Sequence, residues 1–527
     1  DGPDAGEGAW TVADHHTQGY LTFTDTNGFT NVYQAIGSSV TASGTTTTYA
    51  GVADAAGDGV VVTMTVPTTG TSSIAMTDSD GTVTTFTQSG STWQSTSVTE
   101  PGSRTQSTFG YYTSGALNGL VKRILAPVPA NVTCTDANAD TTPGCRSLVL
   151  DYGTPVGTAA GTVRLLDVRA SLPQTSGLSN QKTVAQYTYN SAGYLTEAWD
   201  PRTGLVGQAL KTTYSYDGTS RLSTITPPGE RTWTLFYDSA YRVSKVQRTV
   251  PVGNPISGVS DTTATTTIVY DLPNSLTGVD YPDLTATASW GQTRSVPSPG
   301  SGTAIFEPDH VPAGTTKDTV AASDWKYATL HFLDVNGRET NSATYGAASA
   351  NDHWLIDSTQ YDSNGNTVWQ LSAGNRAQAL SPNSDTDAAV AAMTSQADRA
   401  NLLASTTAYN PADPSEVTDT YGPTHPIKLA NGSTIDGRVH VSTVYDEGAP
   451  NGDVAVSGTA YRLPTTVTTT AYDTNTAVQS DVTTDADVSI VHTGYDAIGG
   501  MATKAGTSAS RPPRLSRWVR RRRRMIS

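Results

Sequence analysis

The feature that most constrains this sequence is a short aromatic–aspartate motif that recurs through its second half. The two best copies read Y-T-Y-N-S-A-G-Y-L-T-E-A-W-D-P-R-T-G at 187–204 and Y-S-Y-D-G-T-S-R-L-S-T-I-T-P-P-G at 214–229. A third, L-F-Y-D-S-A-Y-R-V-S-K-V, follows at 235–246. Tyrosines 189, 216 and 237 are separated by 27 and 21 residues, so each unit is about one β-hairpin long.

The residue types in each unit predict a strand, a turn and a second strand. Alternating tyrosines pair across a ladder, Asp or Asn caps the turn through its own backbone, and Gly accepts a positive φ. A series of such hairpins buries its surface mainly against its neighbours. The motif residues are Tyr187, Tyr189, Asn190, Gly193 and Leu195, then Tyr214, Tyr216, Asp217, Arg221 and Leu222, then Tyr237 and Asp238, and finally Tyr361, Asp362 and Gly365.

Weaker copies extend the series toward the end of the chain. They are F-L-D-V-N-G-R at 332–338, Q-Y-D-S-N-G-N-T-V at 360–368, and the pairs Tyr445-Asp446, Tyr472-Asp473 and Tyr495-Asp496. Near the start, 20–33 and 74–86 realign around Asp-x-Asn/Asp-Gly turns, so two further hairpins are predicted there.

The composition favours the same fold class, mostly antiparallel β. Threonine-rich runs suit pleated, half-wet surfaces, and 24 tyrosines against 7 phenylalanines indicate rings whose hydroxyls reach water or a hydrogen-bond partner. The segment 384–404 is the exception. It is alanine-rich, opens with capping candidates and has apolar residues near helical spacing, so a single inserted helix is expected.

The net charge of −15 argues against general binding to nucleic acid or anionic membranes. The last residues, from Arg511, reverse this charge with eight arginines and no acid. A basic arm is one interpretation of this tail. We favour out-of-frame translation of GC-rich DNA, because the arginines lack aromatic interleaving beyond Trp518. No apolar run reaches the roughly 18 to 20 residues of a membrane-spanning helix.

The two cysteines, Cys134 and Cys145, flank a turn-rich loop. A local disulfide in an exported chain is one interpretation, and two reduced thiols are the other. The chain begins at Asp1 without a methionine, so any export signal has been removed or lies outside it. A secreted or cell-surface location is therefore an inference from composition.

The tyrosine–aspartate units resemble those of the Rhs/YD-repeat family, which includes bacterial polymorphic-toxin shells and teneurin shells. The family unit resembles Tyr-x-Tyr-Asp-x-x-Gly-Arg-Leu followed by a Pro-x-Gly-like turn. The copy at 214–229 matches it except at Ser220, where glycine is usual. In the preceding copy Asn190 replaces Asp and Tyr194 replaces Arg. The resemblance covers about residues 180 to 500, most firmly in the first third.

The resemblance implies a β-sheet wound into a hollow shell, often around a toxic C-terminal domain released by self-cleavage. The shell-closing motif, similar to Arg-Tyr-Tyr-Asp-Pro-x-x-Gly-Arg-Phe, is absent, and D-P-R-T-G at 200–204 is interpreted as a turn. We expect a β-rich N-terminal region at 1–180, a shell segment at 181–500 containing the insertion, and an out-of-frame or disordered tail at 501–527. The frame is expected to shift soon after residue 500, which would leave an incomplete shell.

No residue pattern indicates catalysis, a cofactor or a metal. Gly-x-Ser-x-Gly does not occur, and the adjacent His15 and His16 lack the spacing that places two rings on one face. Two D-x-N-x-D/N starts, at 136–140 and 362–366, lack the rest of a calcium loop and are interpreted as turns. Paired carboxylates for glycoside cleavage stay open, because 47 acidic residues offer many pairs and none stands out.

The predicted function is therefore structural: a non-enzymatic shell fragment whose partner is its own C-terminal, toxin-like domain. The alternative is a surface module that binds cell-wall glycan or a surface protein. In that case exposed aromatic residues such as Trp199, Trp233 and Trp369 would stack on the ligand.

Overall fold

A computed structural model describes residues 11–25, 29–78, 81–100, 105–173, 181–205, 208–250, 262–284, 297, 300–346, 353–384, 386–447, 462–474, 479–495 and 501–508. The contacts divide the chain into two compact units. The first consists of Asp1–Tyr270 and Thr303–Ala328, and the second of Asp271–Gly302 and Thr329–Ser527. The predicted fold class is confirmed, because both units are built mostly from antiparallel strands.

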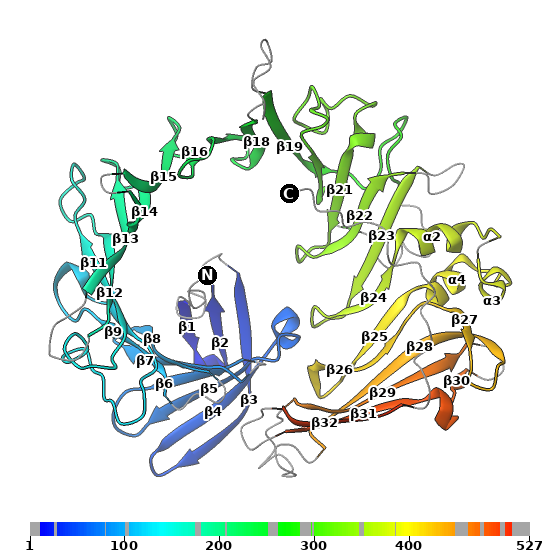
Figure 1. Cartoon of the computed structure of the whole chain (residues 1–527), viewed down its shortest axis with the longest axis horizontal. Coiled ribbons are helices and arrows are strands. Elements are labelled where there is room, and N and C mark those ends of the chain that lie inside the picture. The colour runs from blue at the N-terminus through cyan, green and yellow to red at the C-terminus, as the bar shows by residue number, and fades with distance from the viewer. Residues whose placement is uncertain are drawn as a thin grey trace. The chain divides into compact units, whose positions relative to one another are not determined.

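The first unit is a meander in which every strand from β1 to β19 pairs antiparallel with the next (Figure 1). Its elements are β1 (Thr11–His15), η1 (His16–Gln18), β2 (Tyr20–Thr24), β3 (Thr30–Thr41), β4 (Gly44–Gly51), η2 (Ala53–Ala56), β5 (Val61–Pro67), β6 (Ser73–Thr77), β7 (Val83–Ser89), β8 (Thr92–Thr99), β9 (Ser107–Tyr111), η3 (Gly115–Leu117), β10 (Val121–Leu125), β11 (Ser147–Gly153), β12 (Arg164–Ser171), β13 (Gln181–Tyr189), β14 (Leu195–Leu205), β15 (Gln208–Tyr216), β16 (Leu222–Thr226), β17 (Trp233–Tyr237), β18 (Val243–Val250), β19 (Thr262–Leu272), β20 (Gly302–Phe306) and η4 (Trp325–Tyr327).

The second unit continues the same plan, with β21 to β26 paired in chain order and β28, β29, β31 and β32 extending the antiparallel series. Its elements are β21 (Ala328–Leu333), β22 (Glu339–Tyr345), β23 (Trp354–Tyr361), β24 (Thr367–Leu371), α2 (Ala373–Leu380), α3 (Ala388–Ala391), α4 (Gln396–Leu403), β25 (Ser405–Asn410), β26 (Asp413–Tyr421), β27 (His425–Lys428), β28 (Thr434–Tyr445), β29 (Pro464–Asp473), β30 (Ser480–Asp481), η6 (Asp485–Asp487), β31 (Ser489–Tyr495) and β32 (Met501–Ser508). None of the helices in the described part of the chain is long and apolar enough to cross a bilayer.

Both hairpins predicted near the N-terminus are present, as β2–β3 and β6–β7. Their alternating residues, with those of β4 and β5, supply one apolar core whose buried members include Leu21, Tyr49, Val62, Met64 and Ile74. Phe23 belongs to this core, with its ring 5.4 Å from that of Tyr33 and 5.7 Å from that of Phe86, both edge-on. Burial raises the pKa of Tyr33 to about 12. Strand alternation therefore places one face of these hairpins in the core.

The predicted insertion is helical, but it is not a single helix over 384–404. The segment contains two short helices, α3 and α4, and a third, α2, precedes it; residues of all three share a core with Trp369 and Leu371 of β24. The chain breaks between α3 and α4 because Asp387 and Ser395 each cap a separate helix, accepting main-chain N–H bonds from the first turn. Capping signals inside the segment thus outweigh its continuous alanine content.

The predicted boundaries at residues 180 and 500 stay predictions, and strand structure is present near both of them. Strands β12 and β13 pair directly, from Asp167 opposite Gln186 to Ser171 opposite Gln181, so the sheet continues through the boundary placed at residue 180. Met501–Ser508 forms β32, paired with β31, so strand structure extends into the predicted tail at 501–527. The arginine-rich part of that tail lies outside the described residues.

Candidate functional site

The aspartate of the motif closes a five-residue turn, and Asp238 shows how. One carboxylate oxygen accepts the main-chain N–H groups of Ala240 and Arg242, both at 2.9 Å. The other accepts the Arg242 Nε–H at 2.9 Å. The main-chain N–H of Asp238 donates back to the Arg242 carbonyl, also at 2.9 Å. The turn is therefore held by residues that are all within four positions of one another.

The same arrangement recurs at Asp217–Arg221 and Asp334–Arg338, with carboxylate-to-guanidinium bonds of 2.8 Å in both. Asp362 closes an equivalent turn onto the main-chain N–H of Asn366 at 2.9 Å. In the first copy Asn190 uses its amide oxygen in the same way, accepting N–H bonds from Ala192 and Tyr194 at 3.0 Å. A neutral acceptor is thus sufficient for the turn itself.

The fourth residue of each turn occupies the left-handed region of backbone space. Glycine provides it at Gly193, Gly337 and Gly365, with φ of +82°, +81° and +81°. Ser220 and Tyr241 occupy the same place with φ of +68° and +66°. A side chain in this region costs about 1–2 kcal/mol, so these two copies are strained where the family glycine is missing.

The second tyrosine of each unit joins one hairpin to the one before it. Its hydroxyl donates to a main-chain carbonyl of the preceding hairpin, and Tyr216, for example, bonds the carbonyl of Leu195 at 2.9 Å. We call these bonds rungs, and we call the series of rungs, together with the aspartate-closed turns between them, the ladder. Across the described residues, eight rungs of 2.6–3.1 Å are formed by Tyr189, Tyr216, Tyr237, Tyr270, Tyr361, Tyr409, Tyr445 and Tyr495.

The arginine of each turn forms a second link, in the opposite direction along the chain. The Arg221 guanidinium lies 4.7 Å from the ring centre of Tyr237, and that of Arg242 lies 4.3 Å from that of Tyr270. Arg338 covers Tyr361 in the same way at 4.7 Å. Each of these arginines therefore binds the aspartate of its own unit and the tyrosine of the next.

The first copy keeps this contact although it lacks the arginine. Tyr194, at the arginine position, places its ring 5.1 Å from that of Tyr216 at an interplanar angle of 31°. In this copy a contact between two aromatic rings therefore replaces the contact between a guanidinium and a ring.

The pKa values of Asp217, Asp238 and Tyr216 are shifted by their surroundings. Hydrogen bonds from the Arg221 main-chain N–H, then from the Thr219 hydroxyl, hold the pKa of the Asp217 carboxyl well below its ordinary value. Burial acts to raise the pKa of Asp238, but the Arg242 N–H and guanidinium together bring it below the ordinary value. Burial raises the pKa of Tyr216. Asp217 and Asp238 are thus held in the ionised form and Tyr216 in the protonated form.

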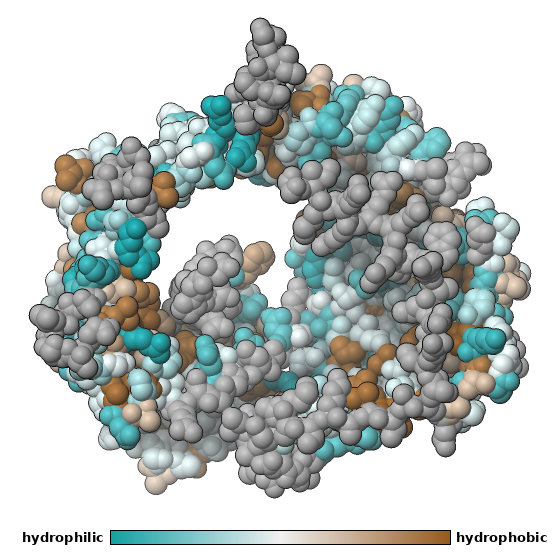
Figure 2. All heavy atoms as spheres, viewed as in Figure 1, coloured by the Kyte–Doolittle hydropathy of each residue, from teal (hydrophilic) through white to brown (hydrophobic). Residues whose placement is uncertain are grey.

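The rungs matter most where the sheet has little core. Among the described side chains between 181 and 250, no hydrophobic residue is fully buried, and most are half-buried. Figure 2 shows apolar and polar residues interspersed over the visible surface. Links between neighbouring hairpins therefore carry stability that a two-layer protein would draw from its interior.

The structure brings most of the predicted motif residues into this ladder and adds two that the sequence analysis missed. Tyr270-Asp271 and Tyr409-Asn410 both contribute rungs, although each carries the tyrosine–Asp/Asn signal in the sequence. Within the described part of the chain Tyr472 forms no rung, and its ring packs edge-on against that of Tyr421 at 5.2 Å. Asp496 lies outside the described residues.

The outer motif tyrosines, Tyr187 and Tyr214, lie on β13 and β15 two residues before the rung tyrosines, where the same strand face repeats. Leu195 and Leu222 start the return strands, opposite Tyr189 and Tyr216. Leu195 and Leu222 are also rung acceptors, through their main-chain carbonyls. Their role in the ladder thus depends on position and not on side-chain chemistry.

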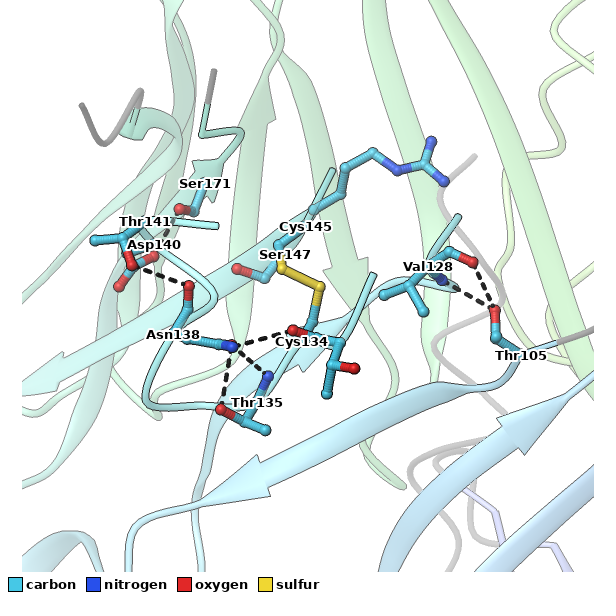
Figure 3. The surroundings of a disulfide bond; sticks show 12 residues. Thr105, Val128, Cys134, Thr135, Asn138, Asp140, Thr141, Cys145, Ser147 and Ser171 are labelled. Carbon is cyan, nitrogen blue, oxygen red and sulfur yellow. Dashed lines mark hydrogen bonds between the residues drawn. A yellow bond between two sulfur atoms is a disulfide. The ribbon is translucent and has the colours of Figure 1, made fainter. Parts of the chain in front are cut away.

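Cys134 and Cys145 form a disulfide with a Cα–Cα distance of 5.8 Å (Figure 3). Within the closed loop, Asp140 receives two bonds from the buried Arg123 guanidinium, at 2.8 and 2.7 Å, and one from the Ser171 hydroxyl at 2.6 Å. Arg123 holds the pKa of Asp140 well below its ordinary value. The loop is therefore closed by the disulfide, and Asp140 holds it against β10 and β12 through an ion pair and hydrogen bonds.

The same contacts account for the D-x-N-x-D start at 136–140. Arg123 also binds Asp136 at 2.8 Å, and the Asn138 amide oxygen accepts the main-chain N–H of Thr135 at 2.7 Å. Both carboxylates thus face a guanidinium. Within the part of the chain that the structure describes, no three His, Cys, Asp or Glu side chains are arranged to hold a metal ion.

The remaining candidates from the sequence are engaged by neighbours. The Trp199 ring is covered by Lys211 at 4.2 Å and the Trp233 ring by Arg248 at 4.8 Å, whereas Trp369 is buried. One face of Trp199 and one face of Trp233 are therefore covered by a cation, and Trp369 is enclosed. His15 stacks on the ring of Tyr20 at 4.5 Å, and His16 binds Asp14 at 2.6 Å.

The segment 200–204 was predicted to be a turn. It lies instead within β14. Asp200 pairs with Arg202 at 2.7 Å, and the register with β15 shifts between Trp199 and Gly204. The proline at 201 explains the irregularity, because it has no main-chain N–H to donate to the neighbouring strand.

No family model and no curated protein matches this sequence. Solved structures that align with it include "TcdB2-TccC3", at 11% identity and a TM-score of 0.22, over 92% of this chain and 28% of that one. A second, "TcdB2-TccC3-Cdc42", aligns at 9% identity and a TM-score of 0.17 over 92% of this chain and 27% of the other. A porin-like protein from Bacteroides uniformis aligns with 49% of this chain and 93% of its own, at 14% identity and a TM-score of 0.18. The chain thus spans just over a quarter of the first two structures.

Proposed function

We propose that this chain is a wall segment of a Rhs/YD-repeat shell, with a structural role and no catalytic centre of its own. The observation that carries the proposal is the ladder of rungs. Tyrosine and aspartate recur because each tyrosine must reach the carbonyl of the preceding hairpin and each aspartate must close its turn. A chain selected to bind a ligand at one place would not need this recurrence.

The partner that we propose is a C-terminal, toxin-like polypeptide of the full-length protein, held behind this wall. A sheet whose residues are half-buried on both faces can separate two compartments without a second layer. We propose an extracellular or cell-surface location, which the disulfide between Cys134 and Cys145 supports, since such bonds persist in oxidising compartments.

The absence of catalysis is also part of the proposal. Two of the carboxyl groups with strongly lowered pKa values, Asp140 and Asp217, owe those shifts to a structural arginine and to a turn. Perturbed titration therefore has a structural cause at both positions.

The test is electron microscopy of the purified chain, combined with protease digestion of an unstructured reporter fused to its C-terminus. We expect particles with a curved wall around a solvent-filled interior, and slower reporter digestion than on an unrelated carrier protein. Solid globular particles with unprotected reporter would contradict a shell. The matched control carries Asp217→Ala, Asp238→Ala and Asp334→Ala, which remove turn closure and should abolish protection.

A further inference from the structure

The second unit contains a buried histidine that the ladder does not use. His440 lies in the middle of β28, which pairs with β26 on one side and β29 on the other. Its side chain is 8% exposed. A polar ring in this position needs hydrogen-bond partners for both of its nitrogens.

Both partners are carboxylates. The Nδ1 atom of His440 lies 2.8 Å from an oxygen of Asp481, and Nε2 lies 2.9 Å from an oxygen of Asp419. A neutral imidazole carries one N–H and can donate to only one of them, whereas the imidazolium donates to both. The geometry therefore suits the charged ring.

The groups around the ring come from four strands. Asp419 and Tyr421 face it from β26, and Tyr421 stacks on it at 4.1 Å with an interplanar angle of 7°. Tyr472 on β29 approaches edge-on at 6.3 Å, and Asp481 faces it from β30. Arg438, two residues before His440 on β28, lies 5.5 Å from the Tyr421 ring.

Asp481 belongs to β30, the shortest strand among the described residues of this unit. β30 has two residues, which pair with Tyr472 and Asp473, and one further main-chain bond of 2.8 Å joins Val482 to Ala471. The Thr470 hydroxyl also donates to Asp481 at 2.7 Å. So short a strand has few main-chain bonds, and the charged contact with His440 supplies much of its attachment to the sheet.

We propose that His440 is a proton-dependent clasp that fastens β30 to the sheet. While the ring carries both protons it neutralises two carboxylates and holds β26, β28 and β30 together. When it loses a proton, one carboxylate is left without its donor beside a second negative charge, and β30 detaches. The clasp therefore holds while both ring nitrogens of His440 carry a proton and opens when one of them does not.

The test uses a nitroxide spin label on the full chain at Ser480→Cys, an exposed position on β30. We expect the mobile fraction of the label to be several-fold larger at high pH, where the ring is neutral, than at low pH, where it is charged. In Asp481→Asn the amide can donate to a neutral ring or accept from a protonated one, so β30 should stay attached and the pH dependence should disappear. His492→Gln, at a more exposed histidine on β31, is the matched control and should behave like the unmodified chain.

A label whose mobility does not change with pH would overturn the proposal. A pH response that persists unchanged in Asp481→Asn would overturn it as well, because the response would then arise elsewhere. Circular dichroism of each labelled variant establishes that the sheet is retained, so loss of folding is separated from release of β30.

Discussion

At the scale of single residues, some groups of the ladder bond only within their own turn, and others contact a neighbouring hairpin. The aspartate of each turn bonds residues two and four positions ahead, as Asp217 does with Thr219 and Arg221. The tyrosine hydroxyl and the arginine instead contact neighbouring units. Removing one or the other should therefore have different consequences.

Loss of one rung should be measurable at Tyr216. In Tyr216→Phe the ring is kept, but the bond to the Leu195 carbonyl is lost. We expect the free energy of unfolding to fall by about 0.5–1.5 kcal/mol, measured by urea denaturation. Tyr214→Phe is the control, because that hydroxyl makes no hydrogen bond within the described residues, and an equal loss there would contradict a role for the rung.

Ser220 should be improved by glycine. Its φ of +68° is the conformation that glycine adopts freely at the same place in other units. We expect Ser220→Gly to stabilise the chain by up to about 1 kcal/mol, after the greater freedom of unfolded glycine is subtracted. Ser239→Gly, in the next turn but without positive φ, should give no gain, and thermal denaturation of both variants distinguishes the two cases.

The pair His331 and Glu339 predicts a pH dependence. The Glu339 carboxylate bonds the ring and raises the pKa of His331 above its ordinary value. A raised folded-state pKa contributes stability that is complete below the unfolded value of about 6.5 and is lost as the pH rises through the folded value. The difference in unfolding free energy from His331→Gln should therefore shrink from about pH 6 to pH 8. A constant difference would contradict the assignment.

At the scale of elements, each hairpin is a local structure completed by its neighbours. The turn determines the register, and Tyr216 lies opposite Leu222 just as Tyr237 lies opposite Val243. Where a longer connection replaces the tight turn, as between Asp446 and Leu463, the aspartate still accepts the main-chain N–H of the returning strand, at 3.0 Å. Turn closure by aspartate thus tolerates insertions.

The disulfide loop should depend on its covalent closure. Cys134→Ser combined with Cys145→Ser opens a loop of sequence separation 11. We expect a loss of about 2–4 kcal/mol in local stability, measured by hydrogen exchange of β10 and β11. A reducing agent should produce the same loss in the unmodified chain and none in the double variant. Unchanged exchange in both would show that the Arg123 contacts alone hold the loop.

At the scale of the whole molecule, stability should be distributed among separate cores and the ladder. The core around Phe23 and Phe86 belongs to the first unit, and the core around Trp369 and Leu403 to the second. Each hairpin contacts mainly its sequence neighbours, so a local defect should spread only over nearby strands.

Large-to-small changes in each core test this locality. Phe86→Ala should cost about 3–5 kcal/mol and Leu403→Ala about 2–5 kcal/mol. Hydrogen exchange should accelerate in β2 to β8 for the first variant and in α2 to α4 for the second, and each variant serves as the control for the other. Acceleration in both units by either variant would show a single cooperative core.

The sequence alone was sufficient for the β-rich class, the motif hairpins and their Asp- or Asn-closed turns, because turn chemistry and strand alternation act over a few residues. The tertiary structure decided what those residues meet. The Leu195 carbonyl lies 21 positions before Tyr216, Arg221 lies 16 before Tyr237, and the cations over Trp199 and Trp233 come from neighbouring strands. Contacts across strands depend on register and twist, which no local pattern specifies. For the same reason the carboxylates that flank His440 emerged only with the sheet.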